Sequence, residues 1–209
     1  MSHAFKLAAS AGALAAILYA GAAVAQGYPR RAILMLVPLQ AASAVDNAAR
    51  IVAQKMAENM GVQIVVENQP GAAGVIGAER VARAAPDGYV MLMASSSSMS
   101  TNPYLAPTRT YDPIASFTPV ILIGYAPNIL VTHPSVPAKT VKELIAVAKA
   151  KPDSLSYASN GAGTLSHLTG ELFMQRAGIK LLHVPYKGGG PAVTDLIAGH
   201  VNILFTTIL

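Results

Sequence analysis

The sequence contains no cysteine and no tryptophan, and only 12% of its 209 residues are charged. Without cysteine the chain forms no disulfide and offers no thiolate, although this absence does not fix the cellular compartment. The low charge and the 53% hydrophobic content argue against a disordered chain and are ample for a core. The length permits one large domain or two small ones.

Clusters of basic residues are also missing, although the formal net charge is +5. The 15 lysines and arginines are scattered along the chain. Basic patches interleaved with aromatic residues, which are typical of nucleic-acid-binding proteins, do not occur. A diffuse positive field of this kind attracts small anions. We therefore expect no nucleic-acid partner.

The patterns of common catalytic and metal sites are absent as well. The five histidines show no metal-binding spacing such as H-E-x-x-H, and the sequence has neither a P-loop nor the G-x-S-x-G turn of serine hydrolases. We expect no metal, no cofactor and no enzymatic activity. The alternative from another class is a secreted hydrolase that uses a serine of the run 95–98 with His167 or His183.

The first 25 residues have the features of an export signal. Lys6 supplies a positive charge, Leu7 to Tyr19 is apolar and rich in alanine, and Ala23-Val24-Ala25 is a small-x-small cleavage pattern. We predict cleavage before Gln26, with an uncleaved membrane anchor as the alternative. Loss of Lys6 lowers the formal charge of the mature chain from +5 to 5 − 1 = +4. We therefore expect the protein to be exported from the cytoplasm.

Two stretches share one plan, in which an apolar strand is followed by a loop of small and hydroxyl residues and then by a helix. They are residues 33–50 and 155–174. Loops of this kind place backbone N–H groups at a helix N-terminus, where a carboxylate or phosphate binds. Two such loops predict two lobes that close on one anion.

The first half of the chain predicts alternating strands and helices. Strands are expected at 32–38, 62–67 and 90–94, with helices from Val45 to Gly61 and over 75–84. Gly61 is a typical residue to end a helix. This β-α-β-α-β order predicts a parallel sheet with right-handed crossovers.

The second half predicts a further α/β unit. The expected elements are an extended crossing segment at 120–132, a helix opened by a capping box of Thr140 and Glu143, strand, loop and helix at 155–177, a strand at 180–185, a helix from Pro191 to Gly199 and a strand at 201–205.

Three loops offer candidate ligand groups. Asp46 is either a cap or dipole partner of its helix or a group that holds water or ligand. The serines at 95–98 are either a polar loop or hydroxyl donors. The run 160–167 (NGAGTLSH) contains Gly161 and Gly163, which permit close backbone approach. We interpret His167 as a structural hydrogen-bonding residue, and Lys187 as either a solvated lysine or a group that steers an anion.

Several longer motifs carry a family resemblance. They are VPLQAASAVDNAAR, VVENQPGAAGVIGAERVARAAPDGY, the dipeptide Asn102-Pro103, YDPIASFTPV, PSVPAKTVKELIAVAKAKP, YASNGAGTLSHLTGELF and HVPYKGGGPAVTDLIAGHV. Together they resemble the periplasmic receptors of tripartite tricarboxylate transporters, the TctC or Bug family, over nearly the whole mature chain. The resemblance implies an α/β, two-lobed Venus-flytrap fold of the periplasmic-binding-protein type, with lobe 1 at 26–122 and lobe 2 at 123–209.

The resemblance also implies a function without catalysis. The protein would capture a small carboxylate as a monomer and pass it to the membrane subunits of a transporter. The implied ligand-binding residues are Gln40, Ala42, Ser43, Asp46 (through water), Ser95, Ser96, Ser97, Asn160, Gly161, Thr164, Ser166 and Thr206.

The sequence departs from the family pattern at three places. Ala42, Ser43 and Ala44 stand where a glycine pair usually precedes the aspartate, and Thr206-Thr207 replaces an aspartate and a small polar residue. The loss of that aspartate is expected either to favour a more anionic ligand or to weaken the binding of an amine-bearing one. The chain also stops at Leu209, which leads us to expect an incomplete second lobe and marginal stability, with a non-functional remnant as an alternative.

Overall fold

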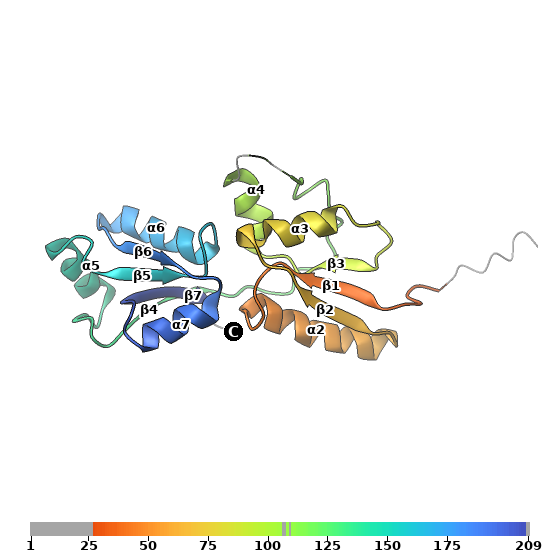
Figure 1. Ribbon diagram of the computed structural model, residues 1–209, viewed down its shortest axis with the longest axis horizontal. Coiled ribbons are helices and arrows are strands. Elements are labelled where there is room, and N and C mark those ends of the chain that lie inside the picture. The colour runs from red at the N-terminus through yellow and green to blue at the C-terminus, as the bar shows by residue number, and fades with distance from the viewer. Residues whose placement is uncertain (1–26, 106–107, 109, 208–209) are drawn as a thin grey trace, which may run out of the picture. The chain divides into compact units, whose positions relative to one another are not determined.

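The computed structural model describes residues 27–105, 108 and 110–207 (Figure 1). The predicted signal peptide at 1–25 lies outside these residues. The described part of the N-terminal unit, residues 27–31, contains a cis peptide bond between Tyr28 and Pro29. All helices and strands of the described residues belong to the second unit, residues 32–209.

The first sheet has the predicted parallel topology. Its strands are β1 (Ile33–Val37), β2 (Ile64–Asn68) and β3 (Val90–Leu92), in the order β2-β1-β3. Helices α2 (Ala44–Met60) and α3 (Val75–Ala82) cover its opposite faces (Figure 1). The β-α-β-α-β prediction is therefore confirmed, with shifts of a few residues at the element ends.

The central strand β1 is buried on both faces, as its continuous apolar run predicts. Met35 and Val37 pack with Ala49 and Ala53 of α2. Leu36 faces α3, where a Cβ built on Gly77 would lie 2.8 Å from its side chain. Glycine at position 77 therefore allows the helix to approach the sheet closely.

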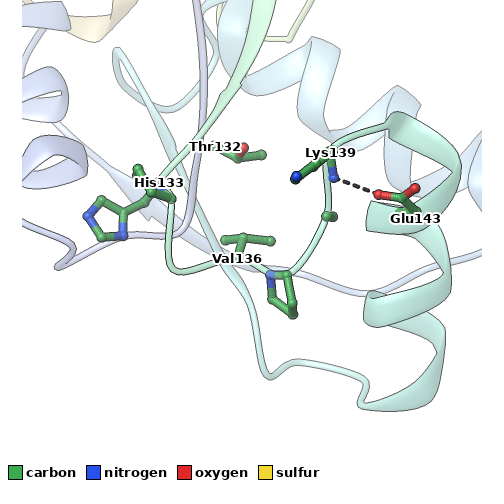
Figure 2. Close-up of a pocket in the computed structure, with 8 residues that line it drawn as sticks. Thr132, His133, Val136, Lys139 and Glu143 are labelled. Carbon is green, nitrogen blue, oxygen red and sulfur yellow. Dashed lines mark hydrogen bonds between the residues drawn. The ribbon is translucent and has the colours of Figure 1, made fainter.

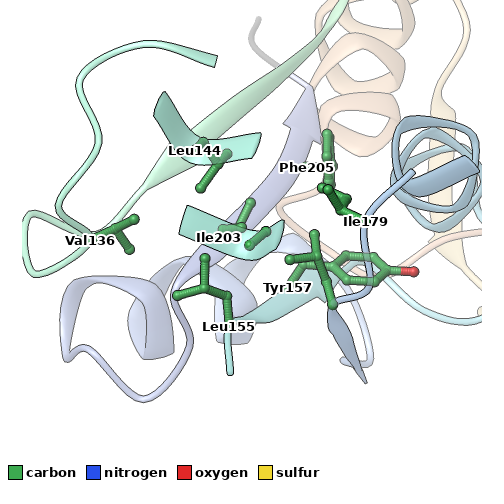
Figure 3. Packing of buried hydrophobic residues seen from close by; sticks show 9 residues of the cluster. Val136, Leu144, Leu155, Tyr157, Ile179, Ile203 and Phe205 are labelled. Atoms are coloured by element: carbon green, nitrogen blue, oxygen red, sulfur yellow. The ribbon is translucent and has the colours of Figure 1, made fainter. Parts of the chain in front are cut away.

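The second sheet has the order β4-β7-β5-β6. Strand β4 (Asn128–Thr132) pairs antiparallel with β7 (Ile203–Thr207). Strand β5 (Ser156–Ser159) pairs in parallel with β7 on one side and with β6 (Leu182–Pro185) on the other. Its helices are α5 (Val141–Ala150), α6 (Leu165–Ala177) and α7 (Gly189–Ile197). Side chains of alternate strand residues pack into two hydrophobic cores on opposite faces of the sheet. One core surrounds Tyr157, Ile203 and Phe205 (Figure 3), and the other surrounds Ala158 and Leu204.

Three local predictions need correction. Only 128–132 of the extended segment 120–132 pairs as a strand, because Pro127 immediately before it has no N–H to donate to a ladder. Helix α7 begins at Gly189, two residues before Pro191, because a proline in the first turn loses no intrahelical bond. The serine run is not a loop, since a π-helix begins at Ser97.

Two predicted helix ends are confirmed. Gly61 ends α2 in the left-handed conformation, with φ of 67°. Thr140 caps α5 by accepting a hydrogen bond from the backbone N–H of Glu143 at 3.2 Å. The Glu143 carboxylate accepts in return from the N–H of Lys139, one residue earlier than in the usual capping box.

Candidate functional site

The loops that carry the candidate residues follow the carboxyl ends of parallel strands, where open α/β sheets bind ligands. The loop at 38–43 follows β1, the loop at 69–71 follows β2, and the serine run follows β3. In the second sheet, the loops at 160–164 and 186–188 follow β5 and β6. Tyr157 pairs with Ile203 and Ala158 with Leu204, and continuing this register of β5 with β7 places Thr206 beside Asn160 at the same edge.

The β1–α2 loop supplies its own cap for α2. Ser43 is the N-cap, and its Oγ accepts a hydrogen bond from the N–H of Asp46 at 3.2 Å. Ala42 adopts φ of 60°, in the left-handed region, although it is not glycine. The loop that lacks the family's usual glycines therefore keeps a conformation that glycine would adopt more easily.

Asp46 is a buried, ionised acceptor at the start of α2. It is only 2% exposed, and its Oδ2 accepts from the N–H of Ala42 at 2.8 Å and from Arg50 Nε at 3.1 Å. Its Oδ1 accepts from Asn68 Nδ2 at 2.9 Å. Burial raises the pKa of this carboxyl, but the hydrogen bonds from Arg50, Asn68 and Ala42 outweigh burial and lower the pKa below its ordinary value. The dipole-partner interpretation of Asp46 is therefore confirmed, and its role toward water or ligand stays a prediction.

The serine run is tied to itself and to a π-helix, η2 (Ser97–Thr101), which sequence patterns did not reveal. Ser95 Oγ lies 3.0 Å from Ser97 Oγ and 3.2 Å from Ser98 Oγ. Ser97 and Ser98 are buried, whereas Ser96 is exposed. Because π-helices occur frequently at functional sites, this element marks the end of β3 as a place of interest.

Asn102, at the start of α4 (Asn102–Leu105), is a buried residue that our candidate list lacked. Its Nδ2 donates to the carbonyl oxygens of Ala73, at 3.1 Å, and Ser97, at 3.0 Å. It thereby joins the π-helix to the loop before α3. The dipeptide Asn102-Pro103 was visible in the sequence, but only as part of the family pattern.

The second of the two strand–loop–helix stretches, residues 155–174, is called the second junction, and the stretch at 33–50 the first. The second junction places its hydroxyl groups beneath the loop at 160–164. Ser166 Oγ accepts from the N–H of Asn160 at 2.9 Å and contacts Thr164 Oγ1 at 2.9 Å. Thr164 Oγ1 donates to the carbonyl of Gly161 at 2.6 Å. Thr164 and Ser166 are buried, and Thr164 forms no side-chain cap bond to any described residue. The first-turn N–H groups of α6 therefore lack the side-chain acceptor that Ser43 gives α2.

His167 has the structural role expected of it. Its Nδ1 accepts from the N–H of Gly163 at 3.2 Å, and its ring stacks on that of His183 with centroids 4.3 Å apart. His183 Nε2 in turn contacts Ser159 Oγ at 2.7 Å. Sequence patterns missed this serine–histidine pair, because the two residues meet only through the pairing of β5 with β6.

The loop before α7 has a neighbouring polar group. Tyr186 donates from its hydroxyl to Asp195 Oδ2 at 2.6 Å, and burial followed by this bond raises the pKa of Tyr186 to about 12. Lys187 is exposed, and its role in steering an anion stays a prediction. The α7 N-cap is Gly188, which has no side chain to cap the helix.

Loops from the two sheets lie in contact. A Cβ built on Gly163 would lie 2.6 Å from Asn102 Oδ1 and 3.6 Å from the Ala73 side chain. A Cβ built on Gly188 would lie 3.0 Å from Gln40 Cγ. The loop at 160–164 therefore lies beside the loop before α3, which the sequence analysis did not single out, and the loop at 186–188 lies beside the loop at 38–43.

A hollow of about 470 Å³ lies elsewhere, between β4 and α5 (Figure 2). Thr132, His133, Lys139 and Glu143 are among its lining residues. Thr132 pairs with Ile203 at the beginning of β7, so this hollow lies at the opposite edge of the sheet from Asn160. We do not assign the ligand to it.

The described residues contain neither a metal-binding cluster nor a membrane-spanning helix. No group of three or more histidine, aspartate or glutamate side chains in the described ranges is arranged to hold a metal ion. Within the same ranges, no helix has the length and apolar character needed to span a membrane.

Solved structures with this fold are periplasmic binding proteins. BugD matches with 36% identity and a TM-score of 0.74 over 86% of this chain and 60% of that chain. A protein of R. palustris with adipate matches with 34% identity and a TM-score of 0.83 over 87% and 60%. MatC from Rhodopseudomonas palustris with bound malate matches with 29% identity and a TM-score of 0.74 over 86% and 60%. The chain thus has the α/β fold of this class.

The family model of the tripartite tricarboxylate transporter family receptor, TctC, matches residues 48–209. Protein BugT of Bordetella pertussis is 39% identical over 178 residues, which are 85% of this chain and 55% of that protein. The chain belongs to the TctC family. It spans a little more than half the length of the curated relatives, such as BugT, that match most of this chain.

Proposed function

We propose that this chain is a periplasmic solute-binding receptor that captures a small carboxylate and delivers it to the membrane subunits of a tripartite transporter. Family membership supports the class, and the relatives with adipate and with malate support the carboxylate. The proposal includes export with cleavage near Ala25 and Gln26, action as a monomer and no catalytic step.

The observation that carries the proposal is the difference in capping between helices. Helices α2 and α5 have side-chain caps, from Ser43 and Thr140. Helices α3, α6 and α7 have none among the described residues, and each starts on a glycine-containing loop. A helix N-terminus carries a partial positive charge and unpaired N–H groups, which a ligand carboxylate satisfies.

These three helix starts are close to one another. A Cβ built on Gly163 would lie 3.6 Å from the Ala73 side chain, so the loops before α6 and α3 are neighbours. A Cβ built on Gly189 would lie 3.5 Å from Asn160 Oδ1, which joins the start of α7 to the second junction. One anion can therefore be served by donors from more than one helix, which strengthens its binding.

Asn160 has a buried amide atom, Oδ1, that finds no hydrogen-bond partner in the described part of the chain. A buried polar atom without a partner is costly. In its present orientation the amide accepts from a ligand hydroxyl, and turned by 180° it donates to a carboxylate oxygen. A ligand that bears a carboxylate, with or without a neighbouring hydroxyl, therefore fits this position.

The proposed ligand contacts are those that the sequence suggested. They are Gln40, Ala42, Ser43, Asp46, Ser95, Ser96, Ser97, Asn160, Gly161, Thr164, Ser166 and Thr206. Asp46 and Ser43 would act through water or through the shape of the loop, because their side chains already bond to protein groups.

Titration calorimetry on the folded 209-residue chain tests the proposal, with adipate and malate as ligands and adipamide as the uncharged control. We expect saturable binding of at least one dicarboxylate and no heat from adipamide. The absence of heat from adipate, malate and a wider panel of di- and tricarboxylates would overturn the proposal and favour a non-binding remnant.

An ester-hydrolysis assay separates the hydrolase alternative. Ser95, Ser97 and Ser98 bond to one another, and the serine that contacts His183 is Ser159, which is fully buried. We expect no turnover of generic esters. Turnover that Ser96→Ala abolishes would favour the hydrolase.

A further inference from the structure

Three aromatic rings stack beneath the second junction. Tyr157 of β5 stacks on His183 of β6 with centroids 4.7 Å apart, and His183 stacks on His167 of α6 at 4.3 Å. Tyr157 is fully buried, and the His167 side chain is 24% exposed. Two imidazoles therefore lie face to face inside the second lobe, next to the loop proposed to bind the carboxylate.

Both glycines of that loop are bonded to this stack. The N–H of Gly163 donates to His167 Nδ1 at 3.2 Å. The N–H of Gly161 donates to Ser159 Oγ at 3.2 Å, and Ser159 Oγ contacts His183 Nε2 at 2.7 Å. Gly161 and Gly163 have φ of 133° and 78°, a backbone conformation that glycine adopts readily and other residues rarely do.

The bond to Gly163 fixes the protonation of His167. A backbone N–H only donates, so Nδ1 must be an unprotonated acceptor and the ring proton lies on Nε2. Nε2 faces Glu171 Oε1 at 3.6 Å. The same carboxylate oxygen accepts from the Tyr157 hydroxyl at 2.6 Å. The ionisable neighbours of the histidine pair among the described residues thus include Glu171 on α6 and Tyr157 on β5.

We propose that His167 is a positioning residue, which in its neutral form holds the loop at 160–164 in the shape that binds the carboxylate and releases that loop when it takes up a second ring proton. This inference rests on the proposed function. A proton on Nδ1 turns the acceptor into a donor that faces another donor, so the bond to Gly163 cannot persist.

The direction of the pH effect on binding follows from the bond between the Gly163 N–H and His167 Nδ1. Burial, and then the charge of His167, lower the pKa of His183, while Glu171 acts in the opposite direction. Loss of the bond to Gly163 releases the loop, so we expect carboxylate affinity to fall as the pH is lowered.

Nuclear magnetic resonance tests the link without any ligand. In the folded chain, the Gly163 amide resonance is expected to shift with pH in the same step as the His167 ring nitrogens. A Gly163 amide that does not follow His167 would overturn the inference, whether or not the protein binds a carboxylate.

Variants test the consequence for binding. In His167→Asn, the amide oxygen stands near the position of Nδ1 but does not titrate, so this variant should bind adipate or malate at pH 8 like the parent. Between pH 8 and pH 5.5 the parent should lose about three- to tenfold more affinity than His167→Asn. This factor corresponds to the net free energy of one hydrogen bond. Protonation of the ligand affects both proteins equally and cancels in this comparison.

The controls separate this inference from the proposed function. His167→Leu lacks the acceptor and should bind about three- to tenfold more weakly at pH 8. His133→Asn, at the opposite edge of the sheet, should keep the parental pH profile. An unchanged profile in His167→Asn would overturn the inference while leaving the receptor function intact, whereas no binding by the parent at any pH would overturn the receptor function.

Discussion

The two junctions that looked alike in the sequence differ in how their helices begin. At the first, Ser43 caps α2, and Asp46 supplies a carboxylate from the chain itself. At the second, Thr164 and Ser166 bond beneath the loop, and within the described residues no side chain caps α6. The first helix start already holds the chain's own carboxylate, and we propose that the second receives that of the ligand. A strand–loop–helix plan therefore indicates an anion site only when its own side chains leave the N–H groups free.

Loss of the internal anion should have the largest effect on stability. Asp46→Ala leaves donors of Arg50, Asn68 and Ala42 without their acceptor, so we expect the free energy of unfolding to fall by about 2–3 kcal/mol. Urea denaturation measures it. A variant of parental stability that no longer binds carboxylate would show that Asp46 serves the ligand rather than the loop.

A side chain at the second junction should mainly affect binding. In Gly163→Ala the new Cβ meets Asn102 Oδ1, and the backbone has positive φ, so the loop must move. We expect adipate or malate affinity to fall about tenfold or more, the value of a charge-assisted hydrogen bond.

Gly178→Ala is the matched control for this change. Gly178 also has positive φ, at 62°, but no described atom lies within 4 Å of its Cβ position. Both variants should lose about 1–2 kcal/mol of stability from backbone strain, and only Gly163→Ala should lose affinity. Equal affinities in the two variants would mean that the second junction does not contact the ligand.

Acid should weaken the first junction only at a lower pH than the proposed release of the second. The pKa of Asp46 is lower in the folded protein than its ordinary value, so its contribution is complete above about pH 4 and is lost as the pH falls through the folded pKa. Urea midpoints measured at pH 6 and pH 3 should differ less in Asp46→Asn than in the parent. Identical pH dependence in the two proteins would contradict the assigned role of Asp46.

The smallest effect concerns Ala42. Ala42→Gly relieves a left-handed alanine and keeps the N–H that donates to Asp46, but it also adds entropy to the unfolded chain. The net gain should be about 0.5 kcal/mol, measurable by thermal and urea denaturation. A loss of stability would indicate that the methyl group packs usefully in the folded loop.

Local signals in the sequence predicted much of the fold. The apolar run of β1, Gly61 after α2 and the pair Thr140 and Glu143 each act over a few residues, so sequence spacing was enough to predict them. The same holds for the position of the candidate loops, because glycine and hydroxyl residues follow apolar strands directly.

Contacts between distant segments were beyond such signals. The π-helix after β3 depends on Tyr111, which donates to the carbonyl of Ser98, and on Asn102. The pairing of Ser159 with His183 depends on the register of β5 and β6. The sequence analysis gave the loop before α3 no role in the site, although Gly71 and Gly74, shortly after a strand, are a signal that could have identified it.

Backbone amide shifts measured while malate or adipate is added to the folded chain test the central claim most directly. The account predicts the largest changes at 160–167, with smaller changes at 42–46, where Asp46 already occupies the helix start. Large shifts at 42–46 with none at 160–167 would contradict the claim that the uncapped junction holds the carboxylate.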